Sequence, residues 1–337
     1  MKFKGDGMRA AALRALGALL SAAVLASCGG GQQVERFVPT RVVAFGDENS
    51  VIDATSHKKW TVNYQADANT AVDCKLNPIW TQVLATAYAL VFPECNTAAT
   101  PVVSPLSRIK AEAGARSAAV QTQIDSFLLS ADGGFAGKDL VTILAGQNDI
   151  LDQYALVTAG SSTEAQAVAV LEQAGTALAG QVNRVGTAGG KVLISTVPDM
   201  GLTPFAIAQG TTNAALLTRL TARFNAKLRV GLINDGHMIG LLLTDELVQA
   251  LVKAKASITN VTDAACAATA ALPDCSTLTL STLVTPTQAT PPTASTLGAW
   301  LWADSPRAGT LEGTHLSPAG HAQLGSLALS RAQNNPF

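Results

Sequence analysis

The chain has 337 residues, of which 48% are hydrophobic and 14% are charged, and its formal net charge is −1. This composition excludes a disordered or fibrous protein, and the nearly neutral balance carries no electrostatic footprint for nucleic acid. A chain of this length can bury a large core as one α/β domain. The sequence has no phosphate-binding glycine loop followed by Lys-Ser/Thr and no closely spaced cysteine pair, so we expect no cofactor and no metal.

The first 27 residues are typical of a bacterial export signal. Charged residues with a net charge of +3 come first and an apolar run follows: Lys2, Lys4, Arg9 and Arg14 against Asp6, then Ala15–Ser27. The run is too short to span a bilayer. It ends in Leu25-Ala26-Ser27-Cys28, which resembles the signal of lipoproteins, whose cysteine becomes the first mature residue and carries lipid. The alternative is an ordinary cleaved signal with a chance cysteine at position 28.

Residues 28–40 are predicted to be a flexible tether, because the stretch begins with glycines and polar residues. By resemblance to lipoproteins, Gly29 after the cysteine favours the outer membrane. Removing 27 residues with a net charge of +3 from a chain with −1 leaves 310 residues with −4. The sequence therefore predicts an exported protein of the bacterial envelope, attached to the membrane through a lipid on Cys28.

The cysteine count fits an oxidising compartment. With Cys28 assigned to the lipid, four of the five cysteines remain, which is an even number. Sequence proximity favours the disulfides Cys74–Cys95 and Cys266–Cys275, although four cysteines allow three pairings. Four buried free thiols are the other interpretation.

Apolar runs that alternate with helical patterns predict the fold class. Four short runs are typical of buried parallel strands: Arg41–Phe45, Leu140–Leu144, Lys191–Val197 and Met238–Leu243. Five segments have helical spacing: Pro78–Val91, Ala118–Ser130, Thr163–Val185, Ala214–Ile233 and Pro318–Gln333. This alternation predicts one α/β domain over residues 41–337, with a parallel sheet covered on both faces. The Thr- and Ala-rich residues 255–298 are expected to form a surface excursion within it.

Three polar motifs carry the candidate chemistry. Gly46-Asp47-Glu48-Asn49-Ser50 follows the first predicted strand, and Gly146-Gln147-Asn148-Asp149 follows the second. The third motif, Glu312-Gly313-Thr314-His315, precedes the last helix. Ligands of parallel sheets bind beyond the carboxyl ends of the strands. Together with Ala113-Gly114-Ala115-Arg116, the motifs resemble those of the SGNH, or GDSL-type, hydrolases, and the resemblance covers nearly the whole chain from Arg41.

The resemblance implies a flavodoxin-like three-layer α/β fold and a role for each matching residue. Gly114 and Asn148 would donate N–H groups to an oxyanion, which is commonly the largest catalytic contribution. His315 would be the general base. The acid that holds the imidazole is expected at Glu312, three residues before His315, where the family has aspartate. Asp304 is the competing acid, if the residues after it form an insertion.

The first motif departs from the family at the nucleophile. Where the family has Gly-Asp-Ser, this chain has Gly46, Asp47 and Glu48, so a carboxylate replaces the hydroxyl. Gly46 and Asp47 are expected to shape the turn. Ser50 would point about 200° away from Glu48 on helical geometry. Three outcomes are open: a dead site that still binds an ester or sugar, Ser50 as a substitute nucleophile, or Glu48 acting itself. Glu48 would act as a nucleophile, as a base on water, or in a glycosidase-like pair with one of the two candidate acids.

Two functions follow from these observations. The leading hypothesis is a membrane-tethered hydrolase of carboxylic esters, on lipid or acylated glycan, with altered chemistry at Glu48. The alternative is a catalytically inactive lipoprotein that binds such an ester or glycan on the same fold. In both cases the partner is a small molecule or a lipid or glycan ester, and nothing in the sequence indicates a protein partner.

Overall fold

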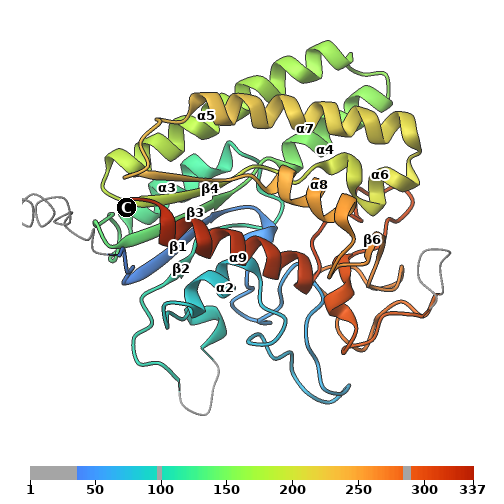
Figure 1. Cartoon of the computed structure of the whole chain (residues 1–337), viewed down its shortest axis with the longest axis horizontal. Coiled ribbons are helices and arrows are strands. Elements are labelled where there is room, and N and C mark those ends of the chain that lie inside the picture. The colour runs from blue at the N-terminus through green and yellow to red at the C-terminus, as the bar shows by residue number, and fades with distance from the viewer. Residues whose placement is uncertain (1–35, 97–100, 284–289) are drawn as a thin grey trace, which may run out of the picture. The chain divides into compact units, whose positions relative to one another are not determined.

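The structure is a computed structural model of the chain, and it describes residues 36–96, 101–283 and 290–337 (Figure 1). The predicted export signal, Cys28 and most of the predicted tether lie outside the described residues. The folded unit runs from Phe37 to Phe337. None of the helices in the described ranges is long and apolar enough to cross a membrane.

The centre of the fold, within these ranges, is a parallel sheet of five strands in the order β2-β1-β3-β4-β5. The strands are β1 (Arg41–Gly46), β2 (Arg108–Ile109), β3 (Asp139–Leu144), β4 (Lys191–Ser195) and β5 (Ile239–Leu242). All four predicted runs are strands of this sheet. The strand order is flavodoxin-like, which confirms the predicted α/β fold. The two-residue β2 carries no apolar run, so the sequence did not indicate it.

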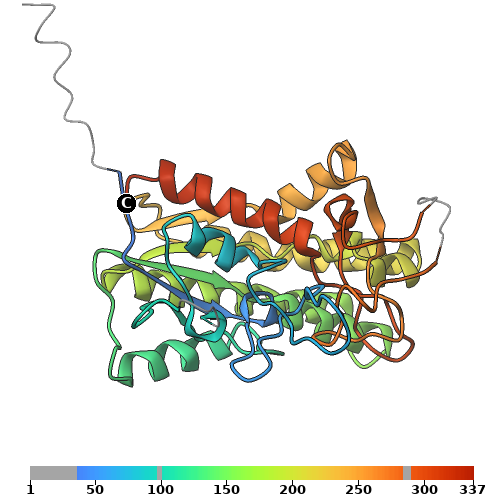
Figure 2. The same cartoon turned by 90° about the horizontal axis from the view of Figure 1, so that it is seen from below.

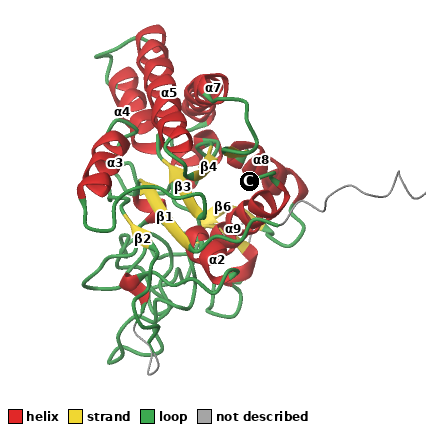
Figure 3. Cartoon of the chain, turned by 90° about the vertical axis from the view of Figure 1, so that its left-hand side faces the viewer, coloured by secondary structure: helices red, strands yellow, loops and turns green. Residues whose placement is uncertain are grey.

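Both faces of the sheet are covered by buried clusters. Successive side chains of a strand point to opposite faces, so a strand that is buried on both faces contributes to both clusters. In β1, Val42 and Ala44 belong to one buried cluster, whereas Val43 and Phe45 belong to the other. The cluster of Val43 includes residues of α3 (Ala119–Leu129), α4 (Gln147–Thr158), α5 (Glu164–Thr187), α6 (Pro204–Ala208) and α7 (Thr211–Gly231). The cluster of Val42 includes α2 (Trp80–Thr86), α8 (Thr244–Ala254) and α9 (Pro318–Asn334). Figure 3 shows the two helical layers on either side of the strands, and Figure 2 shows α9 lying along α2.

The helices differ from the predicted ones in two ways. The segment predicted over Pro78–Val91 is helical only to Thr86, because the chain turns at Ala89, where φ is +57°. Among the described residues, three α-helices were not predicted: α4, α6 and α8. The first turn of α4 coincides with a polar motif that reads as a loop, so its helical pattern is masked by residues that serve the site.

The Thr- and Ala-rich stretch is less superficial than the sequence indicates. It contributes β6 (Asn260–Ala264), which pairs in parallel with β7 (Trp300–Trp302) in a second, small sheet. Cys266 and Cys275 are fully buried in a cluster with Trp300. Both predicted disulfides, Cys74–Cys95 and Cys266–Cys275, are present. Part of the predicted excursion is therefore core, and it stands next to the site described below.

Candidate active site

Loops at the carboxyl ends of three neighbouring strands bring the predicted site together. Glu48 follows β1, Gly114 lies in the loop after β2, and Asn148 lies in the first turn of α4 after β3. Because β1 pairs with both β2 and β3, these loops meet where the strand order of the sheet reverses. Gly46 ends β1 with φ of +125°, and a Cβ there would stand 1.8 Å from the carbonyl oxygen of Leu144. Only glycine fits this exit from the strand.

The carboxylate of Glu48 occupies the position in which a substrate oxyanion was expected. Its Oε2 accepts a hydrogen bond from the backbone N–H of Gly114 at 2.8 Å. The side-chain amide of Asn148 donates to Oε2 and Oε1 at 3.0 and 3.2 Å. Glu48 is only 5% exposed. The two expected oxyanion donors are therefore neighbours, and a carboxylate of the chain itself takes their N–H groups.

His315 lies between Glu48 and Asp304. Its Nε2 is 3.3 Å from Oε1 of Glu48, and its Nδ1 is 3.0 Å from Oδ2 of Asp304. Asp304 also accepts hydrogen bonds from the backbone N–H groups of His315 at 2.8 Å and Gly313 at 2.7 Å. These backbone contacts fix the loop that carries the imidazole. The result is a buried row of carboxylate, imidazole and carboxylate.

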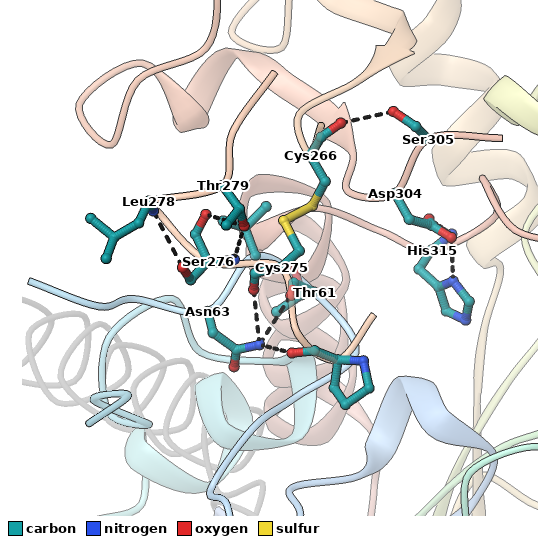
Figure 4. The surroundings of a disulfide bond; sticks show 12 residues. Thr61, Asn63, Cys266, Cys275, Ser276, Leu278, Thr279, Asp304, Ser305 and His315 are labelled. Atoms are coloured by element: carbon teal, nitrogen blue, oxygen red, sulfur yellow. Dashed lines mark hydrogen bonds and ion pairs between the residues drawn. A yellow bond between two sulfur atoms is a disulfide. The ribbon is translucent and has the colours of Figure 1, made fainter. Parts of the chain in front are cut away.

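The small sheet and the second disulfide position Asp304. Figure 4 shows Asp304 beside His315, with the Cys266–Cys275 bond close by. The backbone N–H of Cys266 donates to the carbonyl of Ala303 at 2.7 Å, and Ser305 Oγ donates to the carbonyl of Cys266 at 2.7 Å. Both chain neighbours of Asp304 are thereby tied to a disulfide-linked residue. The stretch that the sequence suggested was superficial therefore supports the acid of the site.

Glu312, the acid that the sequence favoured, has a different partner. Its carboxylate pairs with the guanidinium of Arg307, and both side chains are about one-third exposed. The structure thus brings Asp304, and not Glu312, to His315. The reason is the loop of residues 305–312, which folds back so that the N–H of Gly313 meets Asp304. The family spacing pointed to the wrong carboxylate because this loop separates the acid from the histidine.

Ser50 lies away from the imidazole. Asp47 caps a 3₁₀ turn, Glu48–Ser50, and its Oδ1 accepts from the N–H of Asn49 at 3.1 Å. Ser50 is fully buried, and its Oγ accepts a hydrogen bond from the indole N–H of Trp80 at 3.2 Å. The hydroxyl of Ser50 thus contacts Trp80, whereas the carboxylate of Glu48 contacts Gly114, Asn148 and His315. The structure therefore does not place Ser50 as a substitute nucleophile.

The charges of the row reinforce one another. Burial by itself would lower the pKa of His315, but the carboxylates of Asp304 and Glu48 outweigh it and raise that pKa well above its usual range. Burial opposes ionisation of Glu48 and Asp304, yet their contacts with His315 and with backbone N–H groups hold both pKa values below the ordinary ones. The resting site is an imidazolium between two carboxylates. Burial and then the charge of Glu48 raise the pKa of the neighbouring Asp47 carboxyl well above its usual value.

Gln147 belongs to the site, although the sequence gave it no role. Its Nε2 donates to Oγ1 of Thr314 at 3.1 Å and lies 3.5 Å from Nε2 of His315. Its Oε1 accepts from Nδ2 of Asn49 at 3.3 Å. The side chain thus links the motif after β1 to the loop of the histidine. Its place directly before Asn148, at the start of a helix, is the signal that could have found it.

Two oxyanion donors on separate loops, facing a His–Asp pair on a third, form an acyl-transfer arrangement on a flavodoxin-like sheet. Residues 42–328 match the family model described as GDSL-like Lipase/Acylhydrolase. Since the match spans most of the chain, the chain belongs to the GDSL-like lipase/acylhydrolase family. The resemblance seen in the motifs is thereby confirmed. No curated protein matches the chain.

Several solved structures are similar in fold. An extracellular lipase from Streptomyces rimosus is 15% identical, with a TM-score of 0.42, over 88% of this chain and 100% of that one. The lipase Lip_vut3 from a goat rumen metagenome is 11% identical, with a TM-score of 0.46, over 88% and 99%. Axe2, an acetylxylan esterase from Geobacillus stearothermophilus, is 12% identical, with a TM-score of 0.43, over 88% and 96%.

Proposed function

We propose that this chain is an envelope protein that binds a carboxylic ester, on lipid or acylated glycan, and that Glu48 prevents it from hydrolysing that ester by the serine route. The observation that supports the proposal is that the Glu48 carboxylate contacts the N–H groups of Gly114 and Asn148 and the imidazole of His315. The family supplies the expected ligand class, and the contacts of Glu48 argue against turnover.

Hydrolysis through an acyl-enzyme needs three things that this site lacks in its resting state. It needs a hydroxyl nucleophile, and the side chain at position 48 is a carboxylate. It needs a neutral imidazole to take the proton, whereas the raised pKa of His315 keeps the ring protonated. It needs free oxyanion donors, whereas the N–H groups of Gly114 and Asn148 already bind Glu48. Glu48 accounts for the missing hydroxyl and the occupied donors, and it adds to the rise in the pKa of His315, to which Asp304 contributes most.

The test is to return the hydroxyl. A chain that begins at Gly29 is assayed on p-nitrophenyl acetate and butyrate, as wild type and as Glu48→Ser, Glu48→Ala and Glu48→Ser/His315→Ala. We expect the wild type and Glu48→Ala to be inactive. Glu48→Ser should hydrolyse ester about a hundredfold faster than the wild type, through His315 as base, and the double variant should lose this activity. Ligand retention by the inactive wild type is then measured with acylated oligosaccharides and lipid esters.

A second candidate uses the same carboxylate as a nucleophile. Its support is that the pKa of Glu48 is held below the ordinary value and the pKa of His315 well above it, which favours an anionic nucleophile beside a general acid. Glu48 would attack the acyl carbon, and the alcohol would leave with the proton of His315. The neutral imidazole would then take a proton from the water that hydrolyses the anhydride. The tetrahedral intermediate would expel the Glu48 carboxylate far more easily than an alkoxide and return to the ester. This route therefore favours activated esters, whose alcohol is a good leaving group.

The two candidates give opposite results when two further variants, Glu48→Gln and His315→Ala, are assayed. If the wild type hydrolyses p-nitrophenyl esters, and both Glu48→Gln and His315→Ala abolish the activity, the carboxylate route is established and the binding proposal is wrong. Ser50→Ala serves as the control, because its hydroxyl is bound to Trp80 and has no part in either route.

The proposal includes attachment to the outer membrane through a lipid on Cys28. Its support is the Leu25-Ala26-Ser27-Cys28 motif and the two disulfides, which suit an oxidising compartment. Metabolic labelling with a radioactive fatty acid in a bacterial host should mark the wild type and not Cys28→Ser. Equal labelling of both would show that the cysteine is not the site of attachment.

A further inference from the structure

A pocket lies on the α2 side of the sheet, apart from the candidate active site. None of its lining residues belongs to the row of Glu48, His315 and Asp304. Its volume is about 510 Å³, which is within the range of sites for small molecules. Its apolar wall comes from α2 and from the segment joined by the Cys74–Cys95 disulfide: Pro78, Val83, Ala85, Leu90, Val91 and Phe92. Lys75 lines it as well. The pocket is thus apolar with one cationic group.

Buried hydrogen bonds of Lys59 and Gln82 fix the backbone that forms one wall of the pocket. The ammonium of Lys59 is fully buried and donates to the carbonyls of Cys74, Leu76 and Asn77 at 2.9, 2.8 and 2.8 Å. Three carbonyls match the three N–H groups of an ammonium. Gln82 Nε2 donates to the carbonyl of Cys74 at 2.9 Å. With the disulfide, these bonds fix the wall that carries Lys75, so the pocket exists before any ligand arrives.

Several apolar side chains in the segments that flank the two cysteines of this disulfide are exposed. They are Leu76 at 44%, Val102 at 47%, Val103 at 90% and Leu106 at 55% exposure. Val102 exchanges two hydrogen bonds with Asn96, at 2.8 and 2.9 Å, and Asn96 directly follows Cys95. Leu76 lies two residues after Cys74. The disulfide and the bonds of Asn96 thereby bring the backbone of Val102 and the segment of Leu76 to the two cysteines, and exposed apolar side chains that lie together mark an interaction surface.

The charge at this face suits an anionic headgroup. Lys75 is exposed, and its backbone N–H, not its ammonium, is bound by Asp73 at 2.9 Å. In the described part of the chain no carboxylate forms a salt bridge with that ammonium. Glu94, an acidic side chain of the same segment, is partly buried, and burial raises its pKa. A free cation beside an open apolar pocket matches the two ends of an anionic amphiphile.

We propose that this face docks on a lipid surface, with one acyl chain of an anionic lipid in the α2 pocket and Lys75 at its headgroup. The apolar rim of Leu76, Val102, Val103 and Leu106 would enter the interface of the bilayer, as apolar side chains of peripheral proteins do. The proposal goes beyond the function argued above, since it needs neither Glu48 nor the lipid on Cys28. It makes the membrane a direct ligand of the folded unit.

The first test is flotation with vesicles. The unit from Phe37 onward contains the sheet and both helical layers, so a chain that begins at Gly29 is used, without any lipid on Cys28. Vesicles are made of phosphatidylcholine alone or mixed equally with phosphatidylglycerol. We expect binding to the mixed vesicles, reduced about tenfold by Val103→Glu. Lys75→Gln should reduce it about fivefold and remove the preference for phosphatidylglycerol. The control is Val230→Glu, which changes a valine of α7 that is 84% exposed and lies outside this face.

A second measurement asks whether an acyl chain enters the pocket. Thr86 lines it, and Thr176 is an exposed threonine on α5 at the opposite face of the sheet. Thr86→Cys and Thr176→Cys are each labelled with a fluorophore that is sensitive to polarity. Mixed vesicles should shift the emission to the blue at position 86 only. Failure of the wild type to float, equal loss in Val103→Glu and Val230→Glu, or an unshifted label at position 86 would each overturn the proposal. Hydrolysis by Glu48→Ser is measured separately and does not bear on these outcomes.

Discussion

The backbone N–H of Gly114 donates to Oε2 of Glu48 at 2.8 Å, so the chain binds its own side chain where its relatives are expected to hold an oxyanion. The contact shows that the site has not only lost the nucleophilic hydroxyl. Its oxyanion position is also occupied by the Glu48 carboxylate. A serine replaced by alanine would leave the donors and the histidine available. Glutamate occupies both oxyanion donors and, together with Asp304, raises the pKa of His315, so position 48 decides whether the donors are available.

Glu48→Gln should neutralise His315. The glutamine Oε1 can still accept from Gly114 and Asn148, but its amide then donates to Nε2 of His315, which favours a neutral ring. The pKa of His315, raised well above the usual value by the two carboxylates, should fall. Histidine NMR titration measures it, with Glu112→Gln as the control because this exposed glutamate lies only two residues before Gly114. An unchanged His315 titration would contradict the ion pair.

The same pair has a consequence for stability. A raised folded pKa of His315 stabilises the fold fully below the pKa of an unfolded histidine, about 6.5, and the gain is lost as the pH rises through the folded value. Glu48→Gln should therefore lose stability relative to the wild type near neutral pH more than at high pH. Urea unfolding across this range checks the sign.

Asp304→Asn and Glu312→Gln separate the two candidate acids. Asp304 contacts the imidazole of His315 and accepts hydrogen bonds from the backbone N–H groups of His315 and Gly313. Glu312 instead pairs with Arg307 near the surface. In the Glu48→Ser background, Asp304→Asn should lower the rate of ester hydrolysis by roughly 100-fold or more, because the imidazole loses its orientation. Glu312→Gln should leave the rate within about threefold, since exposed ion pairs contribute little. The reverse order would restore Glu312 as the acid.

The wild type offers a readout that does not depend on activity. Asp304→Asn should lower the pKa of His315, because Asp304 is the strongest of the charges that raise it. Glu312→Gln should leave the histidine spectrum in place. Equal effects of the two variants would mean that the loop of residues 305–312 adopts another arrangement in solution.

Lys59 and Lys58 form a matched pair for a stability test. Burial lowers the pKa of Lys59 to about 7, and its ammonium holds three backbone carbonyls. Lys59→Met leaves these carbonyls unpaired and should cost about 3 kcal/mol of unfolding free energy. Lys58→Met breaks only a surface pair with Asp274 and should cost less than about 1 kcal/mol. Urea denaturation one pH unit below the pKa of Lys59 compares them, and equal costs would contradict the buried role.

The sequence predicted the sheet because its strands are short apolar runs, and it placed Glu48 and Asn148 at one edge because parallel strands end together. It also predicted that Ser50 would turn away from Glu48, since that depends only on local geometry. The choice between Asp304 and Glu312 needed tertiary contacts. Only the fold shows that residues 305–312 form a loop between the acid and the histidine. It also shows that Cys266 is hydrogen-bonded to Ala303 and Ser305, the two chain neighbours of Asp304.

The position of the Glu48 carboxylate was also beyond the sequence. A Gly-Asp-Glu motif shows that the hydroxyl is missing, but not where the longer side chain goes. That depends on the distance from the strand exit to Gly114 and Asn148, which is set by the register of β1 against β2 and β3. The role of Lys59 could not be predicted for a similar reason, because the adjacent lysines Lys58 and Lys59 would both be expected at the surface.

His321 should set part of the acid sensitivity of the fold. It is fully buried in α9, and burial, followed by the charges of Lys59 and His315, lowers its pKa to about 3. Its Nδ1 accepts from the N–H of Trp80 at 3.4 Å, so the folded chain uses the neutral ring. An unfolded histidine binds a proton below about pH 6.5. Unfolding is therefore favoured progressively as the pH falls from that value towards 3, and stability is full only above it.

His321→Gln removes this titration while keeping a group that can accept from Trp80. The slope of unfolding free energy against pH between about 6.5 and 4 should fall by up to about 1.4 kcal/mol per pH unit. His237→Gln is the matched control, since His237 is exposed in a turn before β5. Urea unfolding over the pH series measures the slopes of all three proteins. A slope in His321→Gln that equals the wild-type slope would show that the ring is protonated, or solvated, in the folded chain.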